Sequence, residues 1–256
     1  MRGPEIVSLI RHDKSVYNAL KPLKEASSLY QEFVQAYEKD PDSDKSHRLA
    51  IEVQGQFPFP YTDRDTPLAQ GSGIQSEIMA KNLKQRIDLP DIIYVSPYKR
   101  TIDTLEMMTK GWPELRKVKT VMEERIVEQD YGLASLYNDW RIFNVLHPDQ
   151  RDLYRKQGTF WYRYPQGENV PDVMERSSFW TDILNRDNKG ENVLAVTHHL
   201  FILAFMANIE NLSEKEFLIL NSEQKPINAG VTIYKAKPDN GTNSRLALDV
   251  YNAKLY

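Results

Sequence analysis

Two histidines and two arginines follow apolar runs, at positions where they could hold a phosphate group and attack it. The runs cover residues 6–10, 92–95 and 193–197, and the polar residues that follow them are Arg11, His12, Arg100 and His198. Planar guanidinium groups make paired hydrogen bonds to phosphate oxygens. A neutral imidazole is nucleophilic near pH 7 and can form a covalent phosphoryl intermediate. These residue types predict phosphoryl-transfer chemistry.

The positions of these residues relative to the apolar runs favour a shared site. Helical and extended patterns alternate along the chain, which is typical of a sheet with crossover helices. In an open parallel sheet, ligands bind beyond the carboxyl ends of the strands. A single histidine after a strand is usually an ordinary core or surface residue. Coincidence is a poor explanation for three strand ends that all carry such residues. We therefore predict one binding site at the edge of the sheet where the carboxyl ends of the strands lie.

Five short patterns resemble the signatures of the histidine phosphatase superfamily, the phosphoglycerate-mutase-like proteins. They are Arg11-His12-x-x-Ser15-x-x-Asn18, Ser96-Pro97-x-x-Arg100-x-x-x-Thr104, Arg125-x-x-Glu128-x-x-Tyr131-Gly132, Arg163-x-Pro165-x-Gly167-Glu168 and Thr197-His198. They occur in the order of the family, from about residue 5 to about residue 235. Asp13 stands where the family usually has glycine, and so does His199.

The resemblance implies a role for each matching residue. His12 corresponds to the nucleophile that carries the phosphohistidine, and His198 to the second histidine, which donates to a phosphoryl oxygen. Glu128 corresponds to the acid that protonates the leaving alkoxide and then activates water. The residues expected to contact the substrate are Arg11, Ser15, Asn18, Arg100 and His199. For His199 two orientations stay open, into the pocket or away from it.

The same resemblance implies an α/β fold, a three-layer sandwich in which helices cover both faces of a mostly parallel sheet. We predict one domain over residues 1–256, with a candidate cap insertion at 23–61 whose alternative is a structural excursion without a lid function. Apolar residues from Leu29 to Tyr37 recur at helical spacing inside it. Further helices are expected from Ile74 to just before Leu89, and after Asn169. Closing strands are expected around a turn at 239–241.

Composition narrows the mechanism and the partners. The chain has no cysteine, which excludes disulfides, thiolate metal sites and a cysteine nucleophile. Its formal net charge of −3 provides no general attraction for nucleic acid. We expect no metal and no cofactor, because the arginines already supply positive charge. With no membrane-length apolar stretch and no signal-peptide pattern, a cytoplasmic location is expected. The expected partner is a small phosphorylated substrate. The oligomeric state stays open.

Phosphomonoester hydrolysis is the leading function, with two alternatives. One is a phosphoglycerate-type mutase or a sugar-bisphosphatase, although the Lys-Arg-Arg-Ser-Tyr-Asp and Gly-Trp-x-Asp segments of the mutases are absent. The other is a phosphate-binding protein silenced by Asp13, whose carboxylate would repel a dianion if it faced the pocket. Because both arginines are retained, we predict that Asp13 faces away, towards Lys14 or a neighbouring helix end.

Overall fold

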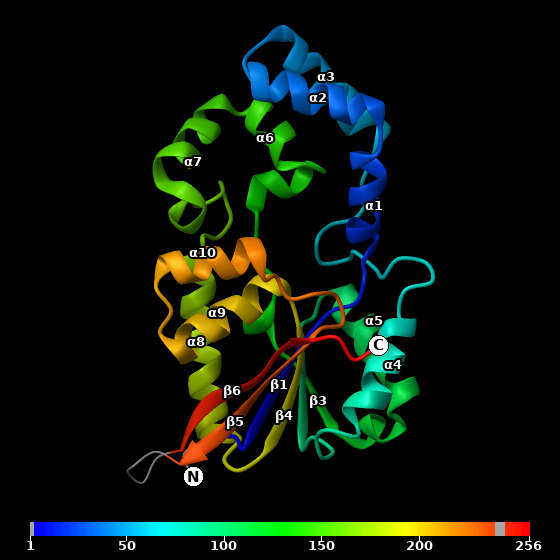
Figure 1. The fold of residues 1–256 in the computed structure, drawn as a ribbon, viewed down its shortest axis with the longest axis vertical. Helices are drawn as coiled ribbons and strands as arrows, with labels where there is room; N and C mark the ends of the chain where they lie inside the picture. The colour runs from blue at the N-terminus through cyan, green and yellow to red at the C-terminus, as the bar shows by residue number, and fades with distance from the viewer. Residues whose placement is uncertain (1–2, 239–243) are drawn as a thin grey trace.

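A six-stranded sheet in the order β3-β2-β4-β1-β5-β6 forms the centre of the molecule (Figure 1). The computed structural model describes residues 3–238 and 244–256. The strands are β1 (Ile6–Arg11), β2 (Ile92–Val95), β3 (Lys119–Met122), β4 (Asn192–Thr197), β5 (Val231–Pro238) and β6 (Ser244–Ala253). The first four strands are parallel to one another, and β5 is antiparallel to both of its neighbours, β1 and β6. The predicted, mostly parallel sheet is therefore confirmed. The turn expected at 239–241 lies outside the described residues.

Helices cover both faces of this sheet, so the predicted three-layer architecture is confirmed (Figure 1). Those of the lower part are α4 (Ile74–Leu83), α5 (Lys99–Gly111), α8 (Val170–Asp187), α9 (His199–Glu210) and α10 (Glu214–Glu223). Those of the upper part are α1 (Val16–Glu25), α2 (Ser28–Lys39), α3 (Asp44–Gln56), α6 (Trp140–Leu146) and α7 (Pro148–Trp161). Short 3-10 turns occupy Pro113–Lys117, Glu124–Ile126 and Gly132–Leu136.

Two apolar cores fix the sheet between its helices. One core joins strand residues such as Val193 to α8 and α9, and the other joins Ile93 to α4 and α5. The central strands are buried on both faces, which is why their sequences read as continuous apolar runs. The start of α9 is buried on all sides, and its sequence is apolar nearly throughout. The strand ends that carry the site are therefore held rigidly.

The predicted helix boundaries are partly right. Helix α8 begins at the predicted cap, because the Asn169 side chain accepts from the backbone N–H of Asp172 in a capping box. Helix α4 ends earlier than predicted, at Leu83. The N–H groups of Arg86 and Ile87 both bond back to the Leu83 carbonyl, so the chain turns there. Ile87 still packs against the core, which is why its spacing resembles a longer helix.

A third apolar core lies above the sheet and defines a substructure that we call the cap, formed by α2, α3 and α6 (Figure 1). Tyr30 and Phe33 of α2 pack against Leu49 and Val53 of α3. Ile142 and Val145 of α6 complete this core, although they are about one hundred residues further along the chain. The helical spacing from Leu29 to Tyr37 is thus confirmed as α2, while the contribution of α6 had no signal in the sequence.

Buried polar contacts attach α1 to the beginning of α6. The ammonium group of Lys24 lies 2.8 Å from a carboxylate oxygen of Asp139, and both side chains are almost fully buried. The Tyr30 hydroxyl donates to the same carboxylate over 2.7 Å. A buried charge of this kind is strongly destabilising if its partner is removed. The cap is therefore joined to the rest of the chain by a charged contact as well as by its apolar core.

Candidate active site

The parallel register brings the predicted catalytic groups to one edge of the sheet. Arg11 of β1 pairs with Thr197 of β4, and Val95 of β2 pairs with Val196 of β4, so the three strands end side by side. The next residues therefore meet: the rings of His12 and His198 have centroids 5.2 Å apart. The guanidinium of Arg100 reaches the same place, with Nε 3.2 Å from His12 Nε2. The predicted convergence of the three strand ends is confirmed.

The hydrogen bonds of His12 determine which nitrogen is free to attack. Its Nδ1 lies 2.7 Å from the carbonyl oxygen of Asp13, which can only accept, so Nδ1 carries the proton. The lone pair is then on Nε2, which accepts from Arg100. Burial, together with the positive charges of Arg100 and Arg11, lowers the pKa of His12 well below 6.5. His12 is thus a neutral base with Nε2 directed at a phosphate-binding arginine.

The second histidine, His198, contacts a hydroxyl group through its Nε2. Ser96 Oγ accepts from the backbone N–H of Tyr98 and lies 2.8 Å from His198 Nε2, to which its hydroxyl can donate. In the tautomer in which Ser96 donates, Nδ1 carries the proton, and this buried nitrogen has no hydrogen-bond partner among the described residues. Burial and nearby positive charge, chiefly that of Arg100, also lower the pKa of His198. His12 thus offers a lone pair, and in this tautomer His198 offers an unused donor.

The pocket has two arginines beside these histidines. Arg11 donates through Nη1 to the carbonyl oxygen of Pro226 over 2.6 Å, and its buried Nε has no partner among the described residues. Arg100 is covered by the ring of Tyr98, 4.8 Å from the guanidinium carbon. Unused N–H groups on fixed guanidiniums suit a phosphate dianion, because no reorganisation is needed when it binds.

Ser15 and Asn18 form the start of α1. Ser15 Oγ accepts from the backbone N–H of Asn18, and the backbone N–H of Ser15 donates to the Asn18 amide oxygen, which completes a capping box. The Ser15 hydroxyl donates to the same amide oxygen. The side chain of Asn228 also donates to that oxygen and to the carbonyl of His12. The Ser15 hydroxyl is thus engaged at the helix cap, and contact between Ser15 and the substrate stays a prediction. Asn18 keeps its amide N–H groups for a ligand.

Asp13 faces away from the pocket, as predicted. Its carboxylate accepts from the backbone N–H of Lys14, and from Gly73 N, Ser76 N and Ser76 Oγ at the start of α4. The positive end of a helix stabilises a carboxylate there. Asp13 has no positive φ, so an aspartate occupies this position, where the family usually has glycine, without backbone strain. Asp13 fixes the carbonyl that orients His12.

We expect Asp13→Gly to reduce stability more than activity. Loss of the carboxylate leaves the buried N–H groups of Gly73 and Ser76 without a partner, at a cost of about 1–3 kcal/mol. Urea unfolding measures this cost, and Asp13→Asn, which keeps one acceptor, should lose less. The ratio kcat/KM should change only a few-fold. A large gain in phosphate affinity with newly acquired turnover would show instead that Asp13 silences the site.

Glu128 lies beside the second histidine, at the first turn of α9. Its Oε1 accepts from the backbone N–H of Leu200, two residues after His198, over 3.0 Å, and from that of Gln129 over 3.1 Å. The charge of Glu128 also acts on Arg11 and on the hydroxyl of Tyr131, whose pKa is raised mainly by burial and secondarily by this carboxylate. The proton donor predicted from spacing is therefore close to both the histidine and the arginine.

One arginine holds the segment that carries Glu128. Arg176, on α8, donates to the backbone carbonyls of residues 125, 127 and 128 and to the carboxylate of Glu168. Gly132 has φ +48 and approaches Pro165 so closely that a Cβ would lie 2.1 Å from its carbonyl oxygen. The third and fourth sequence patterns therefore form one packed unit that supports Glu128.

His199 begins α9, and its Nε2 is buried with no partner among the described residues. Burial and the charges of Arg11 and Lys225 lower the pKa of His199 to about 3, so the ring is neutral near pH 7. A neutral ring can donate or accept one hydrogen bond at its free nitrogen. Contact between His199 and the substrate stays a prediction.

We expect acid to destabilise the fold partly through these buried histidines. An unfolded histidine gains a proton near pH 6.5, while His12 and His198 remain neutral in the folded state because both pKa values are lowered. The unfolded state then binds more protons as pH falls below 6.5. Each such histidine reduces the free energy of unfolding by about 1.4 kcal/mol per pH unit in that range. Denaturant unfolding between pH 7.5 and 5 should give a shallower profile for His198→Gln, and an identical slope would contradict the argument.

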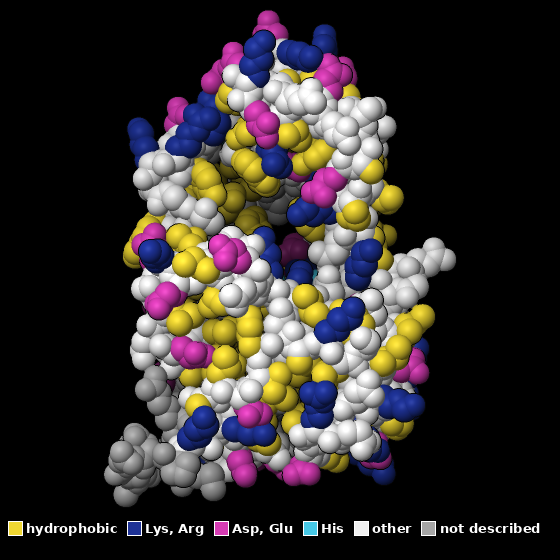
Figure 2. Space-filling view, in the orientation of Figure 1, with side chains coloured by type: hydrophobic (Ala, Val, Ile, Leu, Met, Phe, Trp, Pro, Cys, Tyr) yellow, Lys and Arg dark blue, Asp and Glu magenta, His cyan; other side chains and the backbone are white. Residues whose placement is uncertain are grey.

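Figure 2 shows a hollow between the cap and the sheet, with hydrophobic side chains along its wall and charged side chains at its depth. Tyr17 of α1 is partly exposed and packs against Phe59, their ring centroids 5.5 Å apart. Tyr131 packs against Tyr164 with a centroid distance of 5.2 Å. Tyr17 contributes to the raised pKa of Tyr131, after burial, the charge of Glu128 and Tyr164. Aromatic side chains therefore lie close to the part of the site that carries Glu128.

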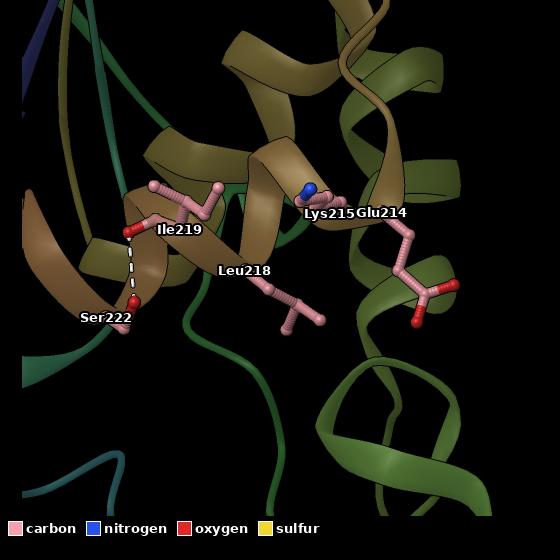
Figure 3. Close-up of a pocket in the computed structure, with 5 residues that line it drawn as sticks. All are labelled: Glu214, Lys215, Leu218, Ile219 and Ser222. Carbon is pink, nitrogen blue, oxygen red and sulfur yellow. Dashed lines mark hydrogen bonds between the residues drawn. The ribbon is translucent and has the colours of Figure 1, made fainter.

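A separate surface pocket lies along α10 and is lined by Glu214, Lys215, Leu218, Ile219 and Ser222 (Figure 3). The Ser222 hydroxyl is already bonded to the carbonyl of Ile219. This pocket has neither a histidine nor an arginine, so it cannot perform the chemistry of the strand ends. Within residues 3–238 and 244–256, no group of three or more acidic or histidine side chains could hold a metal ion. No helix of that same part is long and apolar enough to cross a membrane.

Four residues of the site were not identified from the sequence. Ser96 stood inside a pattern but had no assigned role, and its hydroxyl contacts Nε2 of His198. Asp63, Arg176 and Asn228 had no signal, because single polar residues in a loop or on a helix face resemble ordinary solvent-facing residues. Asp63 contacts Arg100 through both its carbonyl and its carboxylate. A search for polar residues next to Tyr61 at the end of the predicted cap could have found it.

Comparison with known proteins agrees with this geometry. The family model of the histidine phosphatase superfamily (branch 1) matches residues 59–249, and the chain belongs to this family. The match covers the signatures around Arg100, Glu128 and His198, while Arg11 and His12 precede it.

The chain is also similar to curated proteins over part of its length. The chain is 33% identical over 139 residues to the phosphoglycerate mutase-like protein AT74H of Arabidopsis thaliana, covering 50% of this chain and 47% of that protein. It is 29% identical over 160 residues to a 2,3-bisphosphoglycerate-dependent phosphoglycerate mutase of Corynebacterium efficiens, covering 52% of this chain and 62% of that one. The chain thus spans about half the length of the plant relative.

Solved structures support the same fold over nearly the whole chain. A mycobacterial glucosyl-3-phosphoglycerate phosphatase with inorganic phosphate superimposes with a TM-score of 0.63 at 18% identity, covering 98% of both chains. YhfR of Bacillus stearothermophilus gives a TM-score of 0.63 at 19% identity, covering 98% of this chain and 99% of that one. At this identity the likeness concerns the fold alone.

Proposed function

We propose that this protein is a phosphomonoester hydrolase that works through a phosphohistidine on His12. The observation that carries the proposal is that two buried histidines face each other beside two arginines, with the His12 proton held on Nδ1 by the Asp13 carbonyl. His12 presents an unprotonated Nε2 and His198 a buried Nδ1 without a partner among the described residues, and Arg11 and Arg100 lie beside them. This combination provides a nucleophile, a donor and positive charge for one phosphoryl group.

In the first step, His12 Nε2 attacks phosphorus while the bond from phosphorus to the ester oxygen breaks. Glu128 gives its proton to the departing alkoxide, which is a poor leaving group without it. The Nδ1 proton of His12 stays on the ring, where the Asp13 carbonyl stabilises the positive charge of the phosphohistidine. Arg11, Arg100 and His198 donate to the phosphoryl oxygens.

In the second step, Glu128 takes a proton from water, and the resulting nucleophile attacks phosphorus. The bond to Nε2 breaks, inorganic phosphate leaves, and His12 returns to its neutral form. No step needs a metal ion, because the arginines meet the charge. The outward orientation of Asp13 supports turnover over the silenced alternative.

An assay of the purified full chain tests this function. It should hydrolyse p-nitrophenyl phosphate and at least one class of alkyl phosphomonoester, and keep its rate in EDTA. Conversion of 3-phosphoglycerate to 2-phosphoglycerate with 2,3-bisphosphoglycerate, without phosphate release, would identify a mutase instead. Activity that disappears in EDTA and returns with magnesium would contradict the metal-free mechanism. A small phosphorylated substrate and a cytoplasmic location stay predictions.

A further inference from the structure

Arg100 is held by residues on three of its sides. The ring of Tyr98 covers its face, and its Nε donates to His12. On the remaining side, Nη1 donates to the carbonyl oxygen of Asp63 over 2.5 Å and lies 2.9 Å from an Asp63 carboxylate oxygen. The Arg100 side chain is only 5% exposed, so these contacts fix a nearly buried charge.

The two ends of the guanidinium differ in what they can still bind. Nη1 lies on the side away from Nε–H, whereas Nη2 and Nε form one edge with two parallel N–H groups, the edge that suits bidentate binding of phosphate. Among the described residues Nη2 has no hydrogen-bond partner, and Nε faces His12 Nε2. Asp63 therefore occupies the end that phosphate does not need.

The loop that carries Asp63 is tied to the helix that carries Arg100. The carbonyl of Arg64 accepts from the backbone N–H of Lys99, at the first turn of α5, over 2.8 Å. Within the loop, the Thr62 hydroxyl donates to the Asp65 carboxylate, and the Thr66 hydroxyl donates to the Thr62 carbonyl. The contact between Asp63 and Arg100 is thus part of a cross-linked turn.

The charges in the pocket also favour a contact between Asp63 and Nη1 of Arg100. Arg11 and Arg100 place two positive charges in a buried pocket, and an unpaired buried charge is costly. Asp63 supplies a counter-charge to Arg100 from outside the phosphate-binding edge, while its own side chain remains 42% exposed. A carboxylate on the Nε–Nη2 edge would compete with phosphate, whereas one on Nη1 stabilises the arginine in the orientation that phosphate requires.

We propose that Asp63 is a positioning residue, which holds the Nε–Nη2 edge of Arg100 towards His12 and so prepares the phosphate site. The inference rests on the proposed function for its kinetic consequence, but the binding of phosphate is independent of turnover. Asp63 contacts Arg100 and not the reacting atoms.

The test compares Asp63→Ala and Asp63→Asn with Glu106→Ala, which removes an exposed carboxylate from α5, the helix that carries Arg100. Calorimetric titration of the full chain with inorganic phosphate should give a Kd raised about 10- to 100-fold in Asp63→Ala, the scale of a lost hydrogen bond to a charged group. Asp63→Asn keeps an acceptor for Nη1, so it should recover most of the affinity. Glu106→Ala should match the wild type.

Kinetics with p-nitrophenyl phosphate provide a second measurement. Asp63→Ala should raise KM and lower kcat together, because Arg100 serves both the bound phosphate and the transition state, while melting in phosphate-free buffer checks that the fold persists. Tighter phosphate binding in Asp63→Asn would overturn the proposal, since it would show competition for Arg100. A phosphate affinity of Asp63→Ala equal to that of Glu106→Ala would also overturn it. If the wild type binds phosphate without hydrolysing esters, the proposed function fails, and the titration still decides the role of Asp63.

Discussion

His12→Ala lowers the turnover of p-nitrophenyl phosphate by about 10⁴-fold or more, the scale on which loss of an enzyme nucleophile reduces kcat. The loss is large because no other described side chain offers an unprotonated nitrogen towards Arg100. Rapid quench of the wild type with labelled substrate should trap phosphate on the peptide that contains Arg11 and His12. The bond should be labile in acid and stable in base.

The matched control for this variant is His47→Ala, because His47 lies on α3 in the cap, away from the strand ends. It should keep wild-type turnover and the labelled peptide. His12→Ala should lose the label while it still binds inorganic phosphate, because Arg11 and Arg100 remain. Label on Ser15, or a trapped intermediate in His12→Ala, would refute His12 as the nucleophile.

Glu128→Gln should lower kcat for alkyl phosphates by about 10²–10⁴-fold, the usual contribution of general acid catalysis. Glutamine keeps the shape of the side chain and can still accept from the Leu200 N–H, but it cannot give up a proton. Phosphate affinity should change little, because the proton is needed only as the leaving group departs.

The leaving group separates the two roles of Glu128. Nitrophenolate leaves without help, so Glu128→Gln should release about one equivalent of nitrophenol in a burst and then stall as the phosphohistidine, because water is no longer activated. An alkyl phosphate should give no burst. Glu124→Gln, which changes an exposed acid that pairs with Arg64, should behave as the wild type. Equal losses with both substrates and no burst would contradict the assignment.

The three central strands and the polar residues that follow them could be predicted from the sequence alone. A run such as residues 193–197 is apolar because a central parallel strand is buried on both faces, and this pattern is local. The types and spacing of Arg11, His12, Glu128 and His198 also lie in the sequence, and they sufficed to predict one site at one edge of the sheet. The outward orientation of Asp13 followed from the same reasoning.

The tertiary structure decided how these residues are protonated and supported. The nitrogen of His12 that is free to attack depends on a neighbouring carbonyl, while the environment of His198 Nε2 depends on the Ser96 hydroxyl, 102 residues away in the chain. Asp63 and Arg100, which are in contact, are separated by 37 positions in the sequence. Arg176 and the carbonyl groups that it binds around Glu128 are separated by 48 to 51 positions. Local propensity contains no information on such partners, because a side chain in a loop or on a helix face acquires its partner only when distant elements pack.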